Sequence, residues 1–413
     1  MKLSAQSLAW SCDALPSWEA QEVEWQPRAR AALETAVNTG QPVRVVGARG
    51  HGRRDLVARV DPSLKPVDLD ELGKSPLGVQ VGLSVNGYAS HRFPIQAELD
   101  YSGPADPALV AWRVREIGRF DASAVSRLLW DAVRRNRREG RMSLVEWPLV
   151  ALAREAAALA EGEVSDAEVV QALAERDRRR DRHLEAAVRS TEKSRYAVAL
   201  EGSAVGECNG LAVYTAGQFR YGRPLRVSCA FGTGRGGVVS IEKTIGLSGD
   251  THQKGVQTLV GYLRHRHGRR RPLSLHATLT FEQSYKKISG DSASVAELVA
   301  VLSALSGCPV RQDLAITGSV DQRGRAQAVG GVIEKIEGFF RIGGAGVILP
   351  AVNVEDLVLH DEVLEAMDAG RFSLYSYTHV DEALTLLGAD PNAVHEAVGV
   401  ELDALHVASK GKK

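Results

Sequence analysis

One stretch, ISGDSASVAELVAVLSALSG at 288–307, constrains the fold of this chain more than any other. Its apolar residues recur at helical spacing until Gly307 ends the run, which predicts a buried helix with Ser292 at its N-terminus. Free backbone N–H groups and the positive end of the helix dipole gather there and would stabilise an oxyanion formed beside the Ser292 hydroxyl. Ser292 could therefore be a nucleophile. Serine is also a preferred N-cap residue, so the local pattern leaves both roles open.

The sequence that follows this helix supplies a candidate general base. A strand is expected to end near Thr317, and a Gly-rich turn then leads to a second helix with Lys335 in its first turn. The positive end of a helix and partial burial both disfavour an ammonium ion, so we expect a lowered pKa for Lys335. A neutral amine can remove a proton from a nearby serine hydroxyl.

The motifs GDSAS, TGSV and VGGVIEKI and the spacing between them resemble those of the proteolytic domain of the Lon family. The resemblance extends from about Val205 to about Gly388. It implies an α/β domain in which a Ser-Lys dyad hydrolyses peptide bonds. Ser292 would be the nucleophile, Lys335 the general base and Thr317 a hydroxyl that orients the lysine.

Two residues beside the serine refine this resemblance. Asp291 matches the acidic residue that precedes the serine in the Lon branch reading GDSAS, so we include it among the expected catalytic residues. Members of that branch usually carry an acidic residue where this chain has Ser289. The family further implies a closed homohexameric ring whose sites face an inner chamber and act on peptides and on unfolded or loosely folded proteins.

Residues 1–105 contain a pattern close to a nucleotide site. VRVVGARGHGRRDLVARV predicts a strand, a Gly-rich loop and a helix, and residues 47–54 have the spacing of the loop GxxxxGK[ST]. Arg53 replaces the lysine that reaches the phosphates, and Arg54 replaces the hydroxyl that holds magnesium. We therefore expect no ATP hydrolysis, and the resemblance implies a degenerate, shortened AAA+ module.

Residues 106–195 predict several helices, each with an apolar stripe, and Ser165 with Glu168 forms a capping box. By the resemblance this bundle corresponds to the AAA+ lid that precedes a Lon protease domain. The expected fold class is thus α/β, with a C-terminal Lon-type proteolytic domain behind a helical bundle and a small α/β remnant. The predicted boundaries are 1–105, 106–195, 196–400 for the protease domain and 401–413 for a C-terminal tail.

Charge and cysteine usage limit the partners that we expect. Lys+Arg and Asp+Glu both number 51, which gives no reason to expect a nucleic-acid or membrane partner. The 4 cysteines show no CxxC spacing, which is typical of a reducing compartment and argues against a zinc site. No signal-peptide core or long apolar run is present, so we expect a cytoplasmic protein. We also expect neither a cofactor nor a metal.

Other chemical patterns in the protease segment are weaker. Ser284 and Lys287 match the SxxK spacing, but the SDN and KTG motifs that accompany it elsewhere do not follow. Ser294 lies two positions after Ser292, about 200° around a helix, and we expect it to pack or cap. A triad with a histidine is assembled in space and stays open. The histidines without metal-binding spacing are His252, His265, His267 and His276.

Two questions remain open in the sequence. The basic run RHRHGRRR at 264–271 is either a solvated loop or a polyanion site. The chain as a whole is either an ATP-independent Lon-like peptidase or a pseudoenzyme that keeps the fold as an assembly module. The degenerate loop at 47–54 and Ser289 motivate the second hypothesis.

Overall fold

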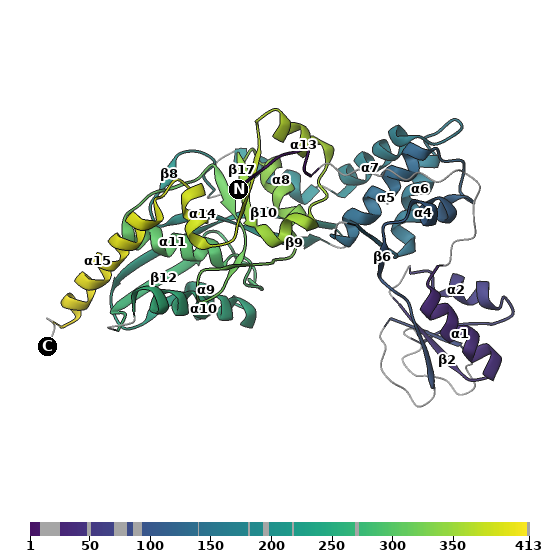
Figure 1. The fold of residues 1–413 in the computed structure, drawn as a ribbon, viewed down its shortest axis with the longest axis horizontal. Coiled ribbons are helices and arrows are strands. Elements are labelled where there is room, and N and C mark those ends of the chain that lie inside the picture. The colour runs from purple at the N-terminus through teal and green to yellow at the C-terminus, as the bar shows by residue number, and fades with distance from the viewer. Residues whose placement is uncertain are drawn as a thin grey trace. The chain divides into compact units, whose positions relative to one another are not determined.

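The computed structural model in Figure 1 describes residues 1–8, 25–47, 51–69, 81–85, 93–138, 140–180, 182–192, 198–216, 219–268 and 272–410. The chain divides into two compact units. The larger consists of Met1–Ala9 with Arg180–Lys413, and the smaller of Trp10–Arg179. Within the described residues, every helix is too short or too polar to cross a membrane.

The larger unit is built on a mixed sheet with the strand order β1-β18-β17-β14-β9-β10-β12-β11. β9, β10 and β12 pair antiparallel, whereas β14 pairs parallel with both β9 and β17. β14 therefore joins the antiparallel strands β9, β10 and β12 to the parallel strands β17 and β18. The edge strand β11 pairs parallel with β12. The bounds are β1 (Lys2–Leu3), β9 (Glu207–Ala216), β10 (Phe219–Thr233), β11 (Gly237–Ser240), β12 (Leu275–Phe281), β14 (Leu314–Ile316), β17 (Gly346–Pro350) and β18 (Ser373–Tyr377).

Helices cover both faces of this sheet and enclose two hydrophobic cores. Side chains alternate along a strand, so Leu314 and Ile316 of β14 enter one core and Ala315 enters the other. The first core lies under α10 (Asp250–His267), α11 (Ser294–Ser306), α14 (Val380–Leu386) and α15 (Pro391–Lys410). The second lies under α12 (Val332–Arg341) and α13 (Asp361–Asp368), with α8 (Arg182–Glu192) at its margin.

Shorter elements connect these layers. Ser240 precedes α9, whose carboxylate Glu242 is buried. Two small antiparallel pairs lie outside the main sheet. The bounds are α9 (Ile241–Thr244), the 3-10 helix η1 (Ala351–Asp356), β8 (Ser203–Ala204), β13 (Val310–Arg311), β15 (Ser319–Val320) and β16 (Ala326–Gln327).

The first residues of the chain lie on the edge of this large sheet. β1 pairs antiparallel with β18, and the Met1 amine donates to the Ser376 carbonyl oxygen at 2.6 Å. The boundary expected from the sequence puts these residues in the N-terminal module 1–105, whereas the structure places them in the larger unit. Leu3 is only 6% exposed there. A strand of two residues has no periodicity that a sequence could reveal.

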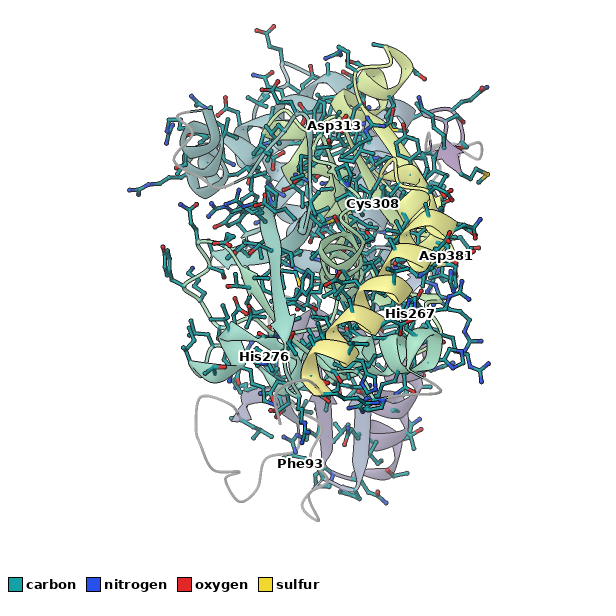
Figure 2. All side chains as sticks on the ribbon, turned by 90° about the vertical axis from the view of Figure 1, so that its left-hand side faces the viewer. Phe93, His267, His276, Cys308, Asp313 and Asp381 are labelled. Atoms are coloured by element: carbon teal, nitrogen blue, oxygen red, sulfur yellow. The ribbon has the colours of Figure 1, made fainter. Side chains whose placement is uncertain are left out.

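The C-terminal helix α15 belongs to the core rather than to a separate tail. It continues without a break past the predicted boundary at 401, and its Leu402 and Leu405 are buried. His395 Nε2 lies 2.9 Å from Asp381 Oδ1, and His395 Nδ1 lies 3.3 Å from His267 Nε2. Figure 2 shows Asp381 and His267 beside this helix. These contacts fasten α15 to α14 and α10.

The smaller unit contains a parallel sheet in the order β3-β4-β2-β5 and a set of helices. One half of the predicted capping box is confirmed, because Ser165 N donates to Glu168 Oε2 at 2.8 Å. The Ser165 hydroxyl accepts from Ala167 N at 3.3 Å and not from Glu168 N. The strands are β2 (Val43–Val46), β3 (Val67–Asp68), β4 (Val81–Ser84), β5 (Ile95–Glu98), β6 (Ser102–Pro104) and β7 (Arg141–Ser143). The helices are α1 (Pro27–Thr39), α2 (Arg53–Val60), α4 (Pro107–Val114), α5 (Ala122–Asn136), α6 (Glu146–Ala157) and α7 (Asp166–Arg180).

Candidate active site

Three of the expected catalytic residues meet beside the N-terminus of α11. Lys335 Nζ donates to Ser292 Oγ at 3.0 Å and to Thr317 Oγ1 at 2.9 Å. Thr317 Oγ1 donates to the backbone oxygen of Ser292 at 3.2 Å. Lys335 and Thr317 are 1% and 0% exposed, whereas Ser292 is half-buried. The serine is thus the member of this group that another molecule can reach.

The turn before α11 determines how Ser292 is presented. α11 begins at Ser294 with Ala293 as its N-cap residue, and no side chain caps it. The Ser292 hydroxyl therefore accepts from the lysine instead of capping the helix, although the sequence had left capping open. Its backbone oxygen accepts from Gly318 N at 2.9 Å, which ties the turn to the end of β14.

Ser294 has the packing role expected for it. Its side chain is 1% exposed, and its Oγ accepts a hydrogen bond from Val320 N at 3.2 Å. That bond anchors the first turn of α11 to β15 and directs this hydroxyl away from the lysine.

Burial tunes the lysine. It lowers the pKa of Lys335 to about 8, the negative charges of Glu334 and Asp291 oppose the shift, and Arg220 adds to it. The sequence predicted a lowered pKa from burial and from the helix dipole together, and burial is the main cause in the structure. A lysine with this pKa holds a substantial neutral fraction at mildly alkaline pH.

Asp291 lies next to the hydrogen-bonded group but not in it. Its Oδ2 accepts from Ser319 Oγ at 3.0 Å, and its charge raises the pKa of Lys335 without direct contact. Ser289, which replaces the usual acidic residue, is exposed, and in the described part of the chain its side chain makes no hydrogen bond. Ser289 therefore does not hold the lysine in this structure.

The helix that carries Lys335 rests on β10 by direct backbone contact. A Cβ atom at Gly222 would clash with the carbonyl oxygen of Glu334, and one at Gly338 would clash with the carbonyl oxygen of Gly222. Only glycine at both positions permits this approach. Sequence reasoning missed the pair, although a glycine inside a strand pattern such as RYGRP is a signal for close backbone contact.

A second buried chain of hydrogen bonds links α10 to α11, and sequence reasoning missed it as well. Ser248 Oγ lies 2.7 Å from His252 Nδ1, and His252 Nε2 lies 2.9 Å from Glu297 Oε1. The order of serine, histidine and carboxylate resembles a catalytic triad, but Ser248 is only 8% exposed. We therefore interpret the chain as a structural link. The signal in the sequence was Glu297, a carboxylate within an otherwise apolar helix.

The other residues that the sequence offered as candidates lie outside this site. Ser284 and Lys287 lie in the loop after β12, and no hydrogen bond joins their side chains in the described structure. His265, His267 and His276 lie on α10 and β12. Among the described residues no group of three or more histidine, cysteine or acidic side chains is placed to hold a metal ion.

Comparison with protein-family models decides the relationship of the larger unit. The model of the Lon protease (S16) C-terminal proteolytic domain matches residues 182–387. The chain carries a Lon-family proteolytic domain. A second model, the AAA+ ATPase LID domain of archaeal LonB, matches residues 119–179 directly before it. The order of the helical LID region and the Lon domain is the one that the sequence predicted.

Individual relatives agree with these models. A putative Lon protease homolog of Escherichia coli (strain K12) is 44% identical over 196 residues, which cover 45% of this chain and 33% of that protein. The archaeal Lon protease of Thermoplasma volcanium is 30% identical over 264 residues, or 60% of this chain and 39% of that protein. The chain thus spans well under two thirds of the length of these curated relatives.

Proposed function

We propose that this chain is a Lon-like serine peptidase that hydrolyses peptide bonds in unfolded or loosely folded proteins with a Ser292–Lys335 dyad. The observation that carries the proposal is the 3.0 Å hydrogen bond from Lys335 Nζ to Ser292 Oγ. The neutral amine takes the proton of the serine while Oγ attacks the scissile carbonyl carbon. The resulting ammonium then protonates the leaving amine, and water hydrolyses the acyl-enzyme.

Thr317 and Asp291 support this pair in different ways. Thr317 Oγ1 accepts from Lys335 Nζ at 2.9 Å and thereby directs the amine toward the serine. Asp291 limits how far burial depresses the pKa of the lysine, and its bond from Ser319 fixes the turn that bears the serine. Neither residue exchanges a proton with the substrate in this mechanism.

We further propose that the smaller unit is a shortened AAA+ remnant that does not hydrolyse ATP. Arg53 is 7% exposed and pairs with Asp68 at 3.8 Å. Its guanidinium group is therefore held in the interior by this ion pair. His51 is wholly buried, and its Nε2 lies 2.9 Å from the Asp100 carbonyl oxygen. A Cβ atom at Gly47 would lie 3.2 Å from the ring of His51. Residues 48–50 of the predicted loop lie outside the described part of the chain.

The same proposal extends to assembly and location. We propose a cytoplasmic homohexamer whose closed ring repeats one heterologous interface and encloses the sites in a chamber. Clients would be peptides and chains without stable structure. We expect neither nucleic acid nor a membrane to be a partner.

An active-site titration tests the proposal. The purified chain is treated with a peptide boronate or a β-lactone, and the modified residue is located by peptide mapping. We expect one covalent adduct per chain at Ser292, lost in Ser292→Ala and retained in Ser284→Ala. No adduct together with no peptidase activity would favour the pseudoenzyme hypothesis instead.

A further inference from the structure

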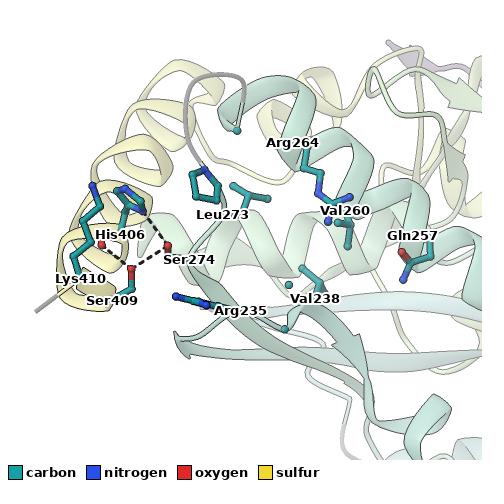
Figure 3. A pocket seen from close by; sticks show the side chains of 14 residues that line it. Arg235, Val238, Gln257, Val260, Arg264, Leu273, Ser274, His406, Ser409 and Lys410 are labelled. Atoms are coloured by element: carbon teal, nitrogen blue, oxygen red, sulfur yellow. Dashed lines mark hydrogen bonds between the residues drawn. The ribbon is translucent and has the colours of Figure 1, made fainter. Parts of the chain in front are cut away.

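A cavity of about 1000 Å³ lies where α10, α15 and the turn between β10 and β11 converge (Figure 3). None of its lining residues belongs to the Ser292–Lys335 site. α15 contributes part of the wall, and this helix begins at Pro391, beyond the residues matched by the Lon domain model. The polar lining side chains are Arg235, Gln257, Arg264, Ser274, His406, Ser409 and Lys410.

Three separate elements each contribute a cation to this cavity. Arg235 comes from the turn before β11, Arg264 from the last turn of α10 and Lys410 from the end of α15. Among the described residues that line the cavity, none is acidic. Across the described structure no carboxylate pairs with any of the three cations. Positive charge therefore accumulates around the cavity, and no carboxylate among its described lining residues offsets it.

Helix ends explain only part of this arrangement. The C-terminus of a helix favours cations, which accounts for Arg264 and Lys410 singly. Arg235 lies on a turn between strands, where no helix dipole favours it. It lines the same cavity as Arg264 and Lys410, so the three cations surround the cavity from different sides (Figure 3).

One wall of the cavity is a connected set of polar groups. Ser274 Oγ lies 3.0 Å from His406 Nδ1 and 3.2 Å from Ser409 Oγ. Ser409 Oγ also donates to the His406 carbonyl oxygen at 2.7 Å. Figure 3 shows this chain of hydrogen bonds, which joins the segment before β12 to α15. It holds hydroxyl and imidazole groups in fixed positions from which they can contact a ligand.

We propose that this cavity binds a small molecule that bears two or more phosphate groups. Guanidinium groups match the oxygens of a phosphate with two parallel hydrogen bonds, and an ammonium adds a third charge. Several cations suit a multiply charged anion better than a single carboxylate. The volume lies at the upper end of the usual range for small-molecule sites, roughly 300–1,000 Å³. A nucleoside triphosphate and inorganic triphosphate share the required chemistry.

Isothermal titration calorimetry on the full chain tests this site with inorganic triphosphate and ATP as probes. The double variant Arg235→Gln, Arg264→Gln removes two of the three cations. Arg371→Gln is the control, because it removes an arginine that is likewise exposed but lies outside the cavity. We expect the wild type and the control to bind triphosphate alike, and the double variant to bind at least about tenfold more weakly. Thermal melts of all three proteins check that folding is unchanged.

The two probes distinguish the source of the phosphate groups. Equal affinity for triphosphate and ATP identifies the phosphates as the recognised group, and tighter binding of ATP adds a contact to the base. The proposal is overturned if the wild type binds neither probe at low salt, or if the double variant keeps the wild-type affinity. Peptidase activity does not enter this readout, so failure here leaves the Ser292–Lys335 proposal unaffected.

Discussion

His252 Nε2 and Glu297 Oε1 lie 2.9 Å apart, and both side chains are at most 1% exposed. This contact joins α10 to the first turn of α11. A second contact lies upstream of Ser292. Gly249, the N-cap residue of α10, donates its backbone N–H to the Ile288 carbonyl oxygen at 2.8 Å. The segment that carries the serine is therefore fixed to α10 at both ends.

Glu297→Gln should destabilise the domain, because it removes one partner of a buried pair and leaves the other. We expect a loss of roughly 3–5 kcal/mol in the free energy of unfolding. Urea denaturation measures it. The control is Glu396→Gln, which removes a carboxylate from an exposed position on α15.

The cost of Glu297→Gln should also depend on pH. Burial alone would lower the pKa of His252, but the hydrogen bond and charge of Glu297, with the charge of Glu242, raise it above the ordinary 6.5. The stability that the raised pKa of His252 provides is fully present below pH 6.5, and it is lost as pH rises through the folded-state pKa of this histidine. The difference between wild type and variant should therefore shrink from pH 6 to pH 9. A constant difference would show that the histidine does not titrate.

Ser292→Ala and Lys335→Ala should each reduce peptidase activity by at least about 10³-fold, and the double variant should be no worse, because the two groups act as one unit. Thr317→Ala should have a smaller effect. The measurement is the initial rate on a fluorogenic peptide, with circular dichroism to verify the fold. Retained turnover in Ser292→Ala would move the nucleophile elsewhere, with Ser284 the next candidate.

Activity should rise with pH through the pKa of the lysine. Burial lowers the pKa of Lys335 to about 8, and only the neutral amine can accept the serine proton. The rate should thus increase about tenfold per pH unit well below pH 8 and level off above it. A profile of kcat/KM from pH 6 to 10 checks this, and a maximum in acid would contradict a lysine base.

Gly222→Ala should impair activity more than the addition of a single methyl group suggests. The added methyl group clashes with the Glu334 carbonyl oxygen, so α12 must move and carry Lys335 away from the serine. Gly232→Ala on the same strand is the matched control, since a Cβ there has nothing within 4 Å. We expect kcat to fall at least about tenfold only in the first variant, since small displacements of a catalytic group have large effects. Equal kcat in both variants would disprove the proposed contact.

Nucleotide should not change the rate of proteolysis. Arg53 and Arg54 replace the groups that would hold phosphates and magnesium, so the chain should not convert ATP hydrolysis into unfolding force. Casein should be cleaved equally with and without ATP, and a stably folded domain should resist cleavage in both conditions. Acceleration of casein cleavage by ATP would contradict the proposal.

The sequence predicted the position of Ser292, Thr317 and Lys335 because each lies at the end of an element that glycines or an apolar run delimit. Their spacing along the chain therefore carried the information. The Gly222–Gly338 contact and the His252–Glu297 pair depend on which elements pack together. The latter joins residues 45 positions apart, and no local pattern indicates such a partner. The packing of α15 on α10 and α14 could not be predicted for the same reason.

The pairing of β1 with β18 has a consequence for biosynthesis. Met1 and Ser376 are 375 positions apart, and a ribosome adds roughly 5–20 residues per second. On the order of tens of seconds therefore separate the emergence of the two strands. During that interval the nascent chain exposes Lys2–Leu3 without its partner while the entire smaller unit is translated. Closing this edge of the sheet is thus a late step in the maturation of the protein, and one that a nascent chain stalled before Tyr377 could not complete.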